Sequence, residues 1–354
     1  MGKKTGLTML GVGVFLLAMG LLSQFYAYGQ LAVVPLNQNT VSYSEGSDAT
    51  VFDIAGKQEI TTDLLSTGNV VGDVAASKKA STDLNRDIAV WEKLTYTTKP
   101  GAVVSEATPP LSASHDRIAF DRHTGEVVPC CGSYISSSAD IDTGDELRDT
   151  ATKVSGLYYK FPFGTQKKTY QYWDGSLKKA VPALYKGTSN LDGLTVYKFE
   201  QEIAPTTVGQ ITAPASFFGI DEDGDVTLDR IYANTRTMWV EPETGVIIKS
   251  QEQQHAVAEY DGDEIATLTD VTSVYSDKTV DANVKEYTAK SSQLKMIRVW
   301  VPLIGDLLGV VLILLGLGLL LRRRSEYRRS ESRREDELER EQDLVDDRPE
   351  EVKA

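Results

Sequence analysis

The sequence predicts a mainly β fold, an antiparallel, barrel-like or curved-sheet extracytoplasmic domain with minor helices, joined to two transmembrane α-helices. Two observations predict it. A long apolar segment lies near each end of the 354-residue chain, and between them short β-branched or alternating runs are separated by Asp-Gly turn signals. The expected parts are an N-terminus at 1–5, a first span at 6–28, a β-rich domain at 29–296, a second span at 299–321 and a charged tail at 322–354.

The first span begins after two lysines. No charged residue occurs between Lys4 and Glu45, and the stretch from Gly6 to Leu22 is almost wholly apolar. Because about 20 helical residues cross the hydrocarbon layer, this segment is long enough to span a membrane. The alternative is a cleaved signal peptide, for which the lysines form the n-region and residues 27–29 form a small-x-small site.

The second span, Trp300 to Leu321, runs directly into three arginines at 322–324. Basic residues that flank a span stay on the cytoplasmic side, and Lys4 indicates the same for the N-terminus. We therefore expect a two-pass plasma-membrane protein with both termini cytoplasmic. Asp306 interrupts the second span within two turns of its outer end. It is either an interfacial carboxylate that reaches water or Arg298, or a polar contact to the first helix or a ligand.

Glycines recur at intervals of seven in both spans. The first span carries them at Gly6, Gly13 and Gly20, and the second at Gly309 and Gly316. Small residues let membrane helices approach closely, so we expect an antiparallel pair packed along these rows. The alternative is that glycine is simply common in membrane helices. The tail beyond Leu321 has few apolar residues, and we expect disorder or a frayed helix there, with its arginines on anionic lipid head groups.

The central domain is strongly acidic and accounts for all of the chain's net charge of −14, because the charges of the remaining segments nearly cancel. This balance argues against nucleic-acid binding, which needs a basic face. Two of its stretches resemble each other, residues 120–128 and residues 240–248, and each reads as a strand, a turn ending in Thr-Gly, and a second strand. Residues 77–84 read as a polar loop or edge. The predicted strands are 118–120, 125–128, 168–172, 194–199, 237–240, 246–249 and 266–275.

Two small motifs suggest sites. Adjacent Cys130 and Cys131 follow a proline, and the favoured interpretation is a structural turn, with a redox switch or metal-thiolate site as the alternative. Asp221, Asp223 and Asp225 alternate as the first ligands of a calcium loop do, but the later ligand positions of that loop are not matched. Solvated turns are the favoured interpretation, so no cofactor is expected, with calcium as the alternative.

No catalytic motif occurs in the chain: there is no Gly-x-Ser-x-Gly, phosphate-binding glycine loop, His-Glu-x-x-His or Cys-x-x-Cys. We therefore do not expect an enzyme. The middle of the domain is instead rich in aromatic residues. Ordinary sheet core is one interpretation, and a β-walled cavity for a lipid-like ligand is the other. The candidate ligand-binding residues are Tyr159, Phe161, Phe163, Trp173 and Phe199.

The residues 119–125 (Ala-Phe-Asp-Arg-His-Thr-Gly), the Cys130-Cys131 pair and the stretch from Tyr159 through Trp173-Asp174 carry a resemblance. They are similar to the actinobacterial porin PorA-like family of two-helix membrane proteins, over nearly the whole chain. That family's function is undefined. A pore needs a closed barrel or a helix bundle, and a monomer of this chain offers only two helices.

The layout also resembles that of the class B scavenger receptors, which have a terminal helix at each side of a large outer domain. Around residues 161–163, Tyr170, Asp174 and 193–199 the local order is similar to theirs. The resemblance implies a barrel-like core with a lipid tunnel, and no individual residue is carried over. The cysteines of that family's outer domain are missing here.

We therefore expect a membrane-anchored envelope protein whose β domain binds or conducts a hydrophobic, lipid-like ligand. The alternatives are a non-catalytic scaffold or assembly factor of the envelope, and a subunit of an oligomeric channel. The expected partners are membrane lipids and a hydrophobic ligand, and the sequence does not indicate the oligomeric state.

Overall fold

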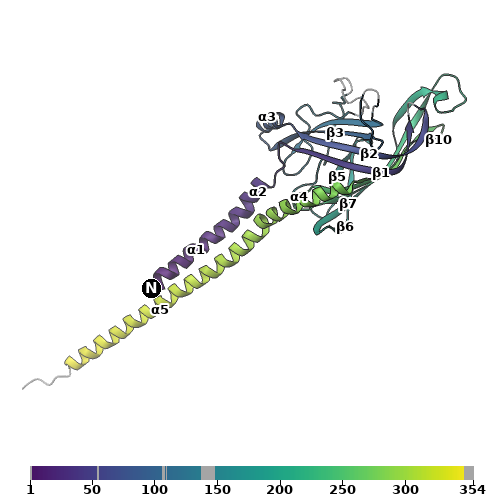
Figure 1. Cartoon of the computed structure of the whole chain (residues 1–354). Helices are drawn as coiled ribbons and strands as arrows, with labels where there is room; N and C mark the ends of the chain where they lie inside the picture. The colour runs from purple at the N-terminus through teal and green to yellow at the C-terminus, as the bar shows by residue number, and fades with distance from the viewer. Residues whose placement is uncertain (1, 54–55, 106–107, 109, 137–147, 347–354) are drawn as a thin grey trace, which may run out of the picture. The chain divides into compact units, whose positions relative to one another are not determined.

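The computed structural model describes residues 2–53, 56–105, 108, 110–136 and 148–346 (Figure 1). They form two compact units. The helical unit is built from residues before 32 and after 294, and the β unit spans residues 32–294.

The helical unit contains two long apolar helices. The first consists of α1 (Gly2–Leu22), the π-helical turn η1 (Ser23–Ala27) and α2 (Tyr28–Leu31), and the second of η4 (Met296–Trp300) and α5 (Val301–Asp346). Leucine, valine and phenylalanine side chains are exposed around the helices, and both helices are long and apolar enough to cross a membrane. Helices that are hydrophobic on all sides are typical of membrane spans.

The charged tail corresponds to the helical alternative rather than to disorder as far as residue 346. Residues 322–346 continue α5 as helix, while residues 347–354 lie outside the described part of the chain. The physical reason is composition: arginine, glutamate, glutamine and leucine are strong helix formers. Pairs such as Asp336 and Arg340, with the acid four residues before the base, add helix stability without any buried core.

The β unit is one ten-stranded antiparallel sheet that curls into a half-barrel (Figure 1). Its spatial order is β4-β3-β2-β1-β10-β9-β8-β7-β6-β5, so the first strand pairs with the last. The expected fold class is confirmed. The strands are β1 (Asn39–Asp53), β2 (Gln58–Gly72), β3 (Ile88–Thr98), β4 (Ser112–Asp121), β5 (Tyr170–Asp174), β6 (Lys179–Leu191), β7 (Leu194–Pro214), β8 (Asp225–Val240), β9 (Ile247–Tyr260) and β10 (Asp263–Tyr275).

The three strands before residue 100 were not predicted from the sequence. β1 and β2 are rich in serine, threonine and acidic residues, and most of their side chains are half-buried or exposed. Polar residues on both faces hide the period of two on which strand prediction depends. By contrast, the Asp-Gly signals at 192–193 and 261–262 are confirmed as hairpin turns, because both residues of each pair have positive φ.

The two edge strands of the sheet, β4 and β5, are joined by short bridging stretches. Phe120 pairs with Val127, Glu126 pairs with Leu157, and Leu157 pairs with Tyr172. Main-chain bonds of 2.8–2.9 Å follow the same path, from the Val127 N–H to Gly156 O and from the Leu157 N–H to Gln171 O. The prediction of a strand at 125–128 is therefore wrong: this stretch forms isolated β-bridges and no continuous strand, and it helps to connect the edge strands β4 and β5.

Two α-helices belong to the described part of the β unit. The loop expected at 77–84 is wrong, because these residues lie in α3 (Val74–Leu84), where the Asp73 carboxylate accepts a 2.9 Å hydrogen bond from the Ala76 N–H. This N-cap lets a short, mostly polar segment become helical. The other helix, α4 (Asp277–Lys295), packs Val284 against Val196 and Ile248 on the outer face of the sheet.

Candidate functional site

The two long helices pack through their glycines. A Cβ on Gly6 would lie 3.2 Å from Gly316 O, and a Cβ on Gly13 would lie 2.7 Å from Gly309 O. At Gly20 a Cβ would overlap the carboxylate of Asp306. The five glycines predicted for helix packing therefore all lie in the contact between α1 and α5. Gly11 provides a contrast, because no atom lies within 4 Å of a Cβ placed there.

In the β unit, residues 157–165 form a segment that we call the strap. Its side chains enter two different core clusters. Leu157 and Phe161 pack with Phe199 of β7, and the rings of Phe161 and Phe199 stack with their centroids 4.6 Å apart. Tyr159 and Phe163 pack against the cluster of Trp91 and Phe120 from β3 and β4. The strap thus fastens the two ends of the sheet to each other.

Four of the five candidate ligand-binding residues, Tyr159, Phe161, Phe163 and Phe199, belong to these two clusters. Trp173 lies in a third cluster with Ile118 and Ile135, against which Tyr159 also packs. Phe161, Phe199 and Trp173 are at most 4% exposed, and Tyr159 and Phe163 are half-buried. The Tyr159 hydroxyl donates a 2.7 Å hydrogen bond to Trp91 O. In this structure these rings fill the space between the strap and the strands, and the binding of a hydrophobic ligand there stays a prediction.

Two turns hold the strap through its main chain. The Phe161 N–H donates to Gly245 O at 2.8 Å and the Thr165 N–H to Pro242 O at 2.7 Å. On the other side, the Phe163 N–H donates to His123 O at 3.2 Å. These turns are the two Thr-Gly stretches that resemble each other in the sequence, so their similarity has a structural counterpart.

Lys160 of the strap is almost completely buried, at 4% exposure. Its Nζ lies 3.8 Å from the centroid of the Phe163 ring and has no hydrogen-bond partner among the described residues. Burial lowers the pKa of Lys160 to about 7, although the nearby Glu241 carboxylate favours the charged form. No sequence pattern indicated this residue, since an isolated lysine is ordinarily exposed.

A charged network lies on the inner face of the curled sheet. Arg236 of β8 bonds Glu252 at 2.9 Å, Asp174 at 3.2 Å and the Gln201 side-chain oxygen at 2.8 Å. Burial alone would raise the pKa of Glu252, but Arg236 lowers it to about 2. Lys93 of β3 is half-buried and is attracted to Glu252, although their strands are not neighbours, because the sheet curls.

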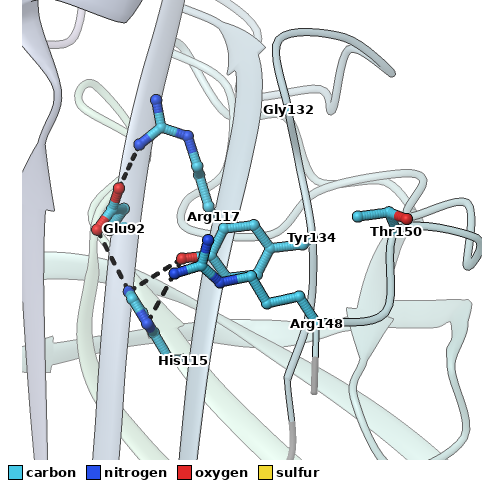
Figure 2. Close-up of a pocket in the computed structure, with 7 residues that line it drawn as sticks. All are labelled: Glu92, His115, Arg117, Gly132, Tyr134, Arg148 and Thr150. Atoms are coloured by element: carbon cyan, nitrogen blue, oxygen red, sulfur yellow. Dashed lines mark hydrogen bonds and ion pairs between the residues drawn. The ribbon is translucent and has the colours of Figure 1, made fainter. Parts of the chain in front are cut away.

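A polar cavity of about 390 Å³ lies on the opposite face of β3 and β4 (Figure 2). Glu92 bonds His115 at 3.2 Å and also pairs with Arg117, and the Arg148 guanidinium lies 4.6 Å from the Tyr134 ring centroid. Arg117 also bonds Asp73 at 2.7 Å. The charge of Arg117 is therefore balanced by two carboxylates, those of Glu92 and Asp73.

The Cys130 and Cys131 sulfurs are bonded to each other at 2.11 Å. The pair lies in a turn and packs against Ala80, Ile88 and Val128. Of the three candidate calcium ligands, Asp221 and Asp223 are exposed on the turn before β8, and Asp225 is the exposed first residue of that strand. Among the described residues no group of three or more His, Cys, Asp or Glu side chains converges as a cation site. Calcium binding, the alternative to solvated turns, stays untested.

The two apolar helices and the curled sheet define the class: this is a membrane protein in which a β domain lies between two membrane helices in the sequence. A family model described as Porin PorA matches residues 5–318, so the chain belongs to that family and the resemblance seen in the sequence is confirmed. The chain is 26% identical to the Porin PorA of Corynebacterium amycolatum over 319 residues, covering 75% of this chain and 82% of that protein. It is 28% identical to the Porin PorA of Corynebacterium resistens over 284 residues, covering 62% and 68%.

Proposed function

We propose that this chain is a non-catalytic subunit of an oligomeric channel in the cell envelope. The membrane path would form between the helix pairs of several copies. The observation that carries the proposal is the contact between α1 and α5, where glycine backbones touch and leave no lumen within one pair. A path for polar solutes must be lined by a helix bundle or a closed barrel, so one pair is insufficient. The Porin PorA name of the relatives supports the same function.

The same proposal includes the orientation of the chain. The arginines at 322–324 and the lysine at position 4 favour a cytoplasmic position for both ends, which would put the β domain outside the plasma membrane. Protease added to intact cells should then remove the β domain. Removal only after the cells are permeabilised would reverse the orientation.

Conductance is the direct test. The full-length protein, purified in mild detergent and added to planar lipid bilayers, should produce stepwise currents and should cross-link into oligomers. Gly13→Leu should abolish the currents, because its side chain would collide with Gly309 of α5. Gly11→Leu is the matched control, since the space beside Gly11 is open. A wild-type protein that is monomeric and silent would refute the channel.

A hydrophobic ligand of the β domain is the second candidate. It is favoured by the concentration of aromatic rings on the strap, and a lipid would have to displace Phe161 or Phe163 to bind there. Mass spectrometry of lipids that co-purify with the protein tests it against a mock preparation. Equal lipid content in the two preparations would remove this candidate.

A further inference from the structure

Asp306 is a single carboxylate within an apolar surface. It lies on α5 six residues after Trp300, a rise of roughly 9 Å along a helix. Its neighbours Leu303, Leu307 and Leu308 are 50–65% exposed. A charged group at such a depth is costly against acyl chains and is found almost only where it faces protein or water.

The environment of Asp306 within the helix pair is incomplete. Its Oδ1 is fully covered where α5 meets Gly20, and it has no hydrogen-bond partner among the described residues. The glycine is what makes room for the carboxylate, since a Cβ at position 20 would overlap it. The side chain as a whole is only half-buried, so the rest of the carboxylate reaches the surface of the pair.

The cation nearest to Asp306 along α5 and η4 does not complete the site. Arg298 lies eight residues earlier, roughly 12 Å along the axis, and its guanidinium is over the Tyr28 ring at 5.6 Å. No ion pair joins Asp306 to another residue in the part of the chain that the structure describes. A carboxylate with a covered, unbonded oxygen and an open side is suited to a cation supplied from outside the pair.

We propose that Asp306 is a cation-binding residue that lines the path between helix pairs and makes that path selective for cations over anions. The inference rests on the proposed channel function. In an assembly of several copies, the open sides of the carboxylates form a ring of negative charge, which concentrates cations and repels anions. The ring also explains how a charged side chain can persist in an apolar belt, because it faces water rather than lipid.

The test is the reversal potential of the full-length protein in a bilayer with a potassium chloride gradient. Wild-type protein should favour potassium over chloride. Asp306→Asn should lower the permeability ratio several-fold toward equality while the protein still conducts, and Asp306→Glu should keep the wild-type ratio. Cross-linking of each variant checks that the oligomer still forms, so that loss of assembly is not mistaken for loss of selectivity.

The outcomes separate the two proposals. Conductance with a potassium-to-chloride ratio that is unchanged in Asp306→Asn would overturn the role of Asp306 and leave the channel standing, with the carboxylate merely reaching water at the interface. Wild-type selectivity for chloride would overturn it as well. Absence of any current from the wild-type protein would refute the channel, and the inference with it.

Discussion

The two Thr-Gly turns that hold the strap share one hydrogen-bond pattern but differ in burial. In the first turn the Asp121 carboxylate accepts the N–H groups of His123 and Thr124 at 3.0 and 2.9 Å. In the second the Glu241 carboxylate accepts the N–H groups of Glu243 and Thr244 at 3.1 and 2.8 Å.

The difference lies in their surroundings. Asp121 is half-buried, and its other oxygen bonds Arg86 at 3.2 Å, whereas Glu241 is fully buried near Lys160. The comparison shows that one turn geometry, closed by a carboxylate that accepts two backbone N–H groups, forms both near the surface and in the core. In the core, however, every bond to the carboxylate matters more, because water cannot replace it.

The largest effect should come from removing the buried carboxylate. Glu241→Ala leaves buried N–H and hydroxyl donors of residues 243 and 244 without their acceptor, and we expect a loss of roughly 3–5 kcal/mol in unfolding free energy. Asp121→Ala is the matched variant and should cost about 1 kcal/mol, since water can reach its donors. Urea unfolding followed by tryptophan fluorescence measures both. Equal losses would mean that burial does not distinguish the turns.

The glycines that end the turns give the next effect. Gly125 and Gly245 have nearly the same φ, +74° and +72°, so alanine is strained similarly at both. A Cβ on Gly245 would overlap the carbonyl oxygens of Phe161 and Pro162, whereas on Gly125 it would lie 2.9 Å from Lys160 O. We expect Gly245→Ala to cost roughly 2 kcal/mol more than Gly125→Ala, because the overlap at Gly245 is deeper and the backbone of the strap must move farther. Thermal unfolding of the two variants should therefore rank them in that order, and the reverse order would contradict the strap contact.

The smallest effect concerns pH and is specific to the buried turn. The pKa of Lys160 is about 7 in the folded chain and near 10.5 when the chain is unfolded, so the unfolded state binds more protons between these values. The stability of the folded protein should therefore rise with pH across this window, by about 2 kcal/mol from pH 7 to pH 9. Well below pH 7 Lys160 is protonated in both states and contributes no slope.

Lys160→Met isolates this contribution, because methionine fills a similar volume without a charge. The difference in unfolding free energy between wild type and variant should change across pH 7–9 and be flat at lower pH. A constant difference over the whole range would mean that Lys160 keeps its proton in the folded protein.

Parts of this arrangement could be predicted from the sequence. The similarity of the two turns is visible in the sequence, because in both stretches a Thr-Gly pair begins four residues after an apolar strand residue, Phe120 or Val240. The glycine rows could be predicted as the packing faces because a spacing of seven residues is close to two helical turns. Their register, with Gly6 against Gly316 and Gly13 against Gly309, comes only from the structure. The sequence does not decide whether the aromatic rings fill a core or line a cavity, because their partners are far away along the chain. Phe161 stacks on Phe199, and the Tyr159 hydroxyl bonds Trp91 O.

Other features depend on context that a local pattern does not contain. α3 forms because the Asp73 cap and the buried Ser77 and Ala80 compensate for a weak helical pattern. The burial of Lys160 follows from the two turns closing over the strap. Asp306 was noticed in the sequence, but its covered oxygen depends on the position of Gly20 in the other helix.

The pairing of β1 with β10 sets the order in which this domain can be completed. Ser44 of the first strand lies opposite Tyr275 of the last, so the early strands keep an unsatisfied edge until the ribosome has passed the end of β10. Such distant pairing makes folding slow and leaves the nascent chain open to wrong association. A chain truncated within β10 should consequently aggregate rather than fold, and a cell that makes this protein has to shield its first strands for most of the time that synthesis takes.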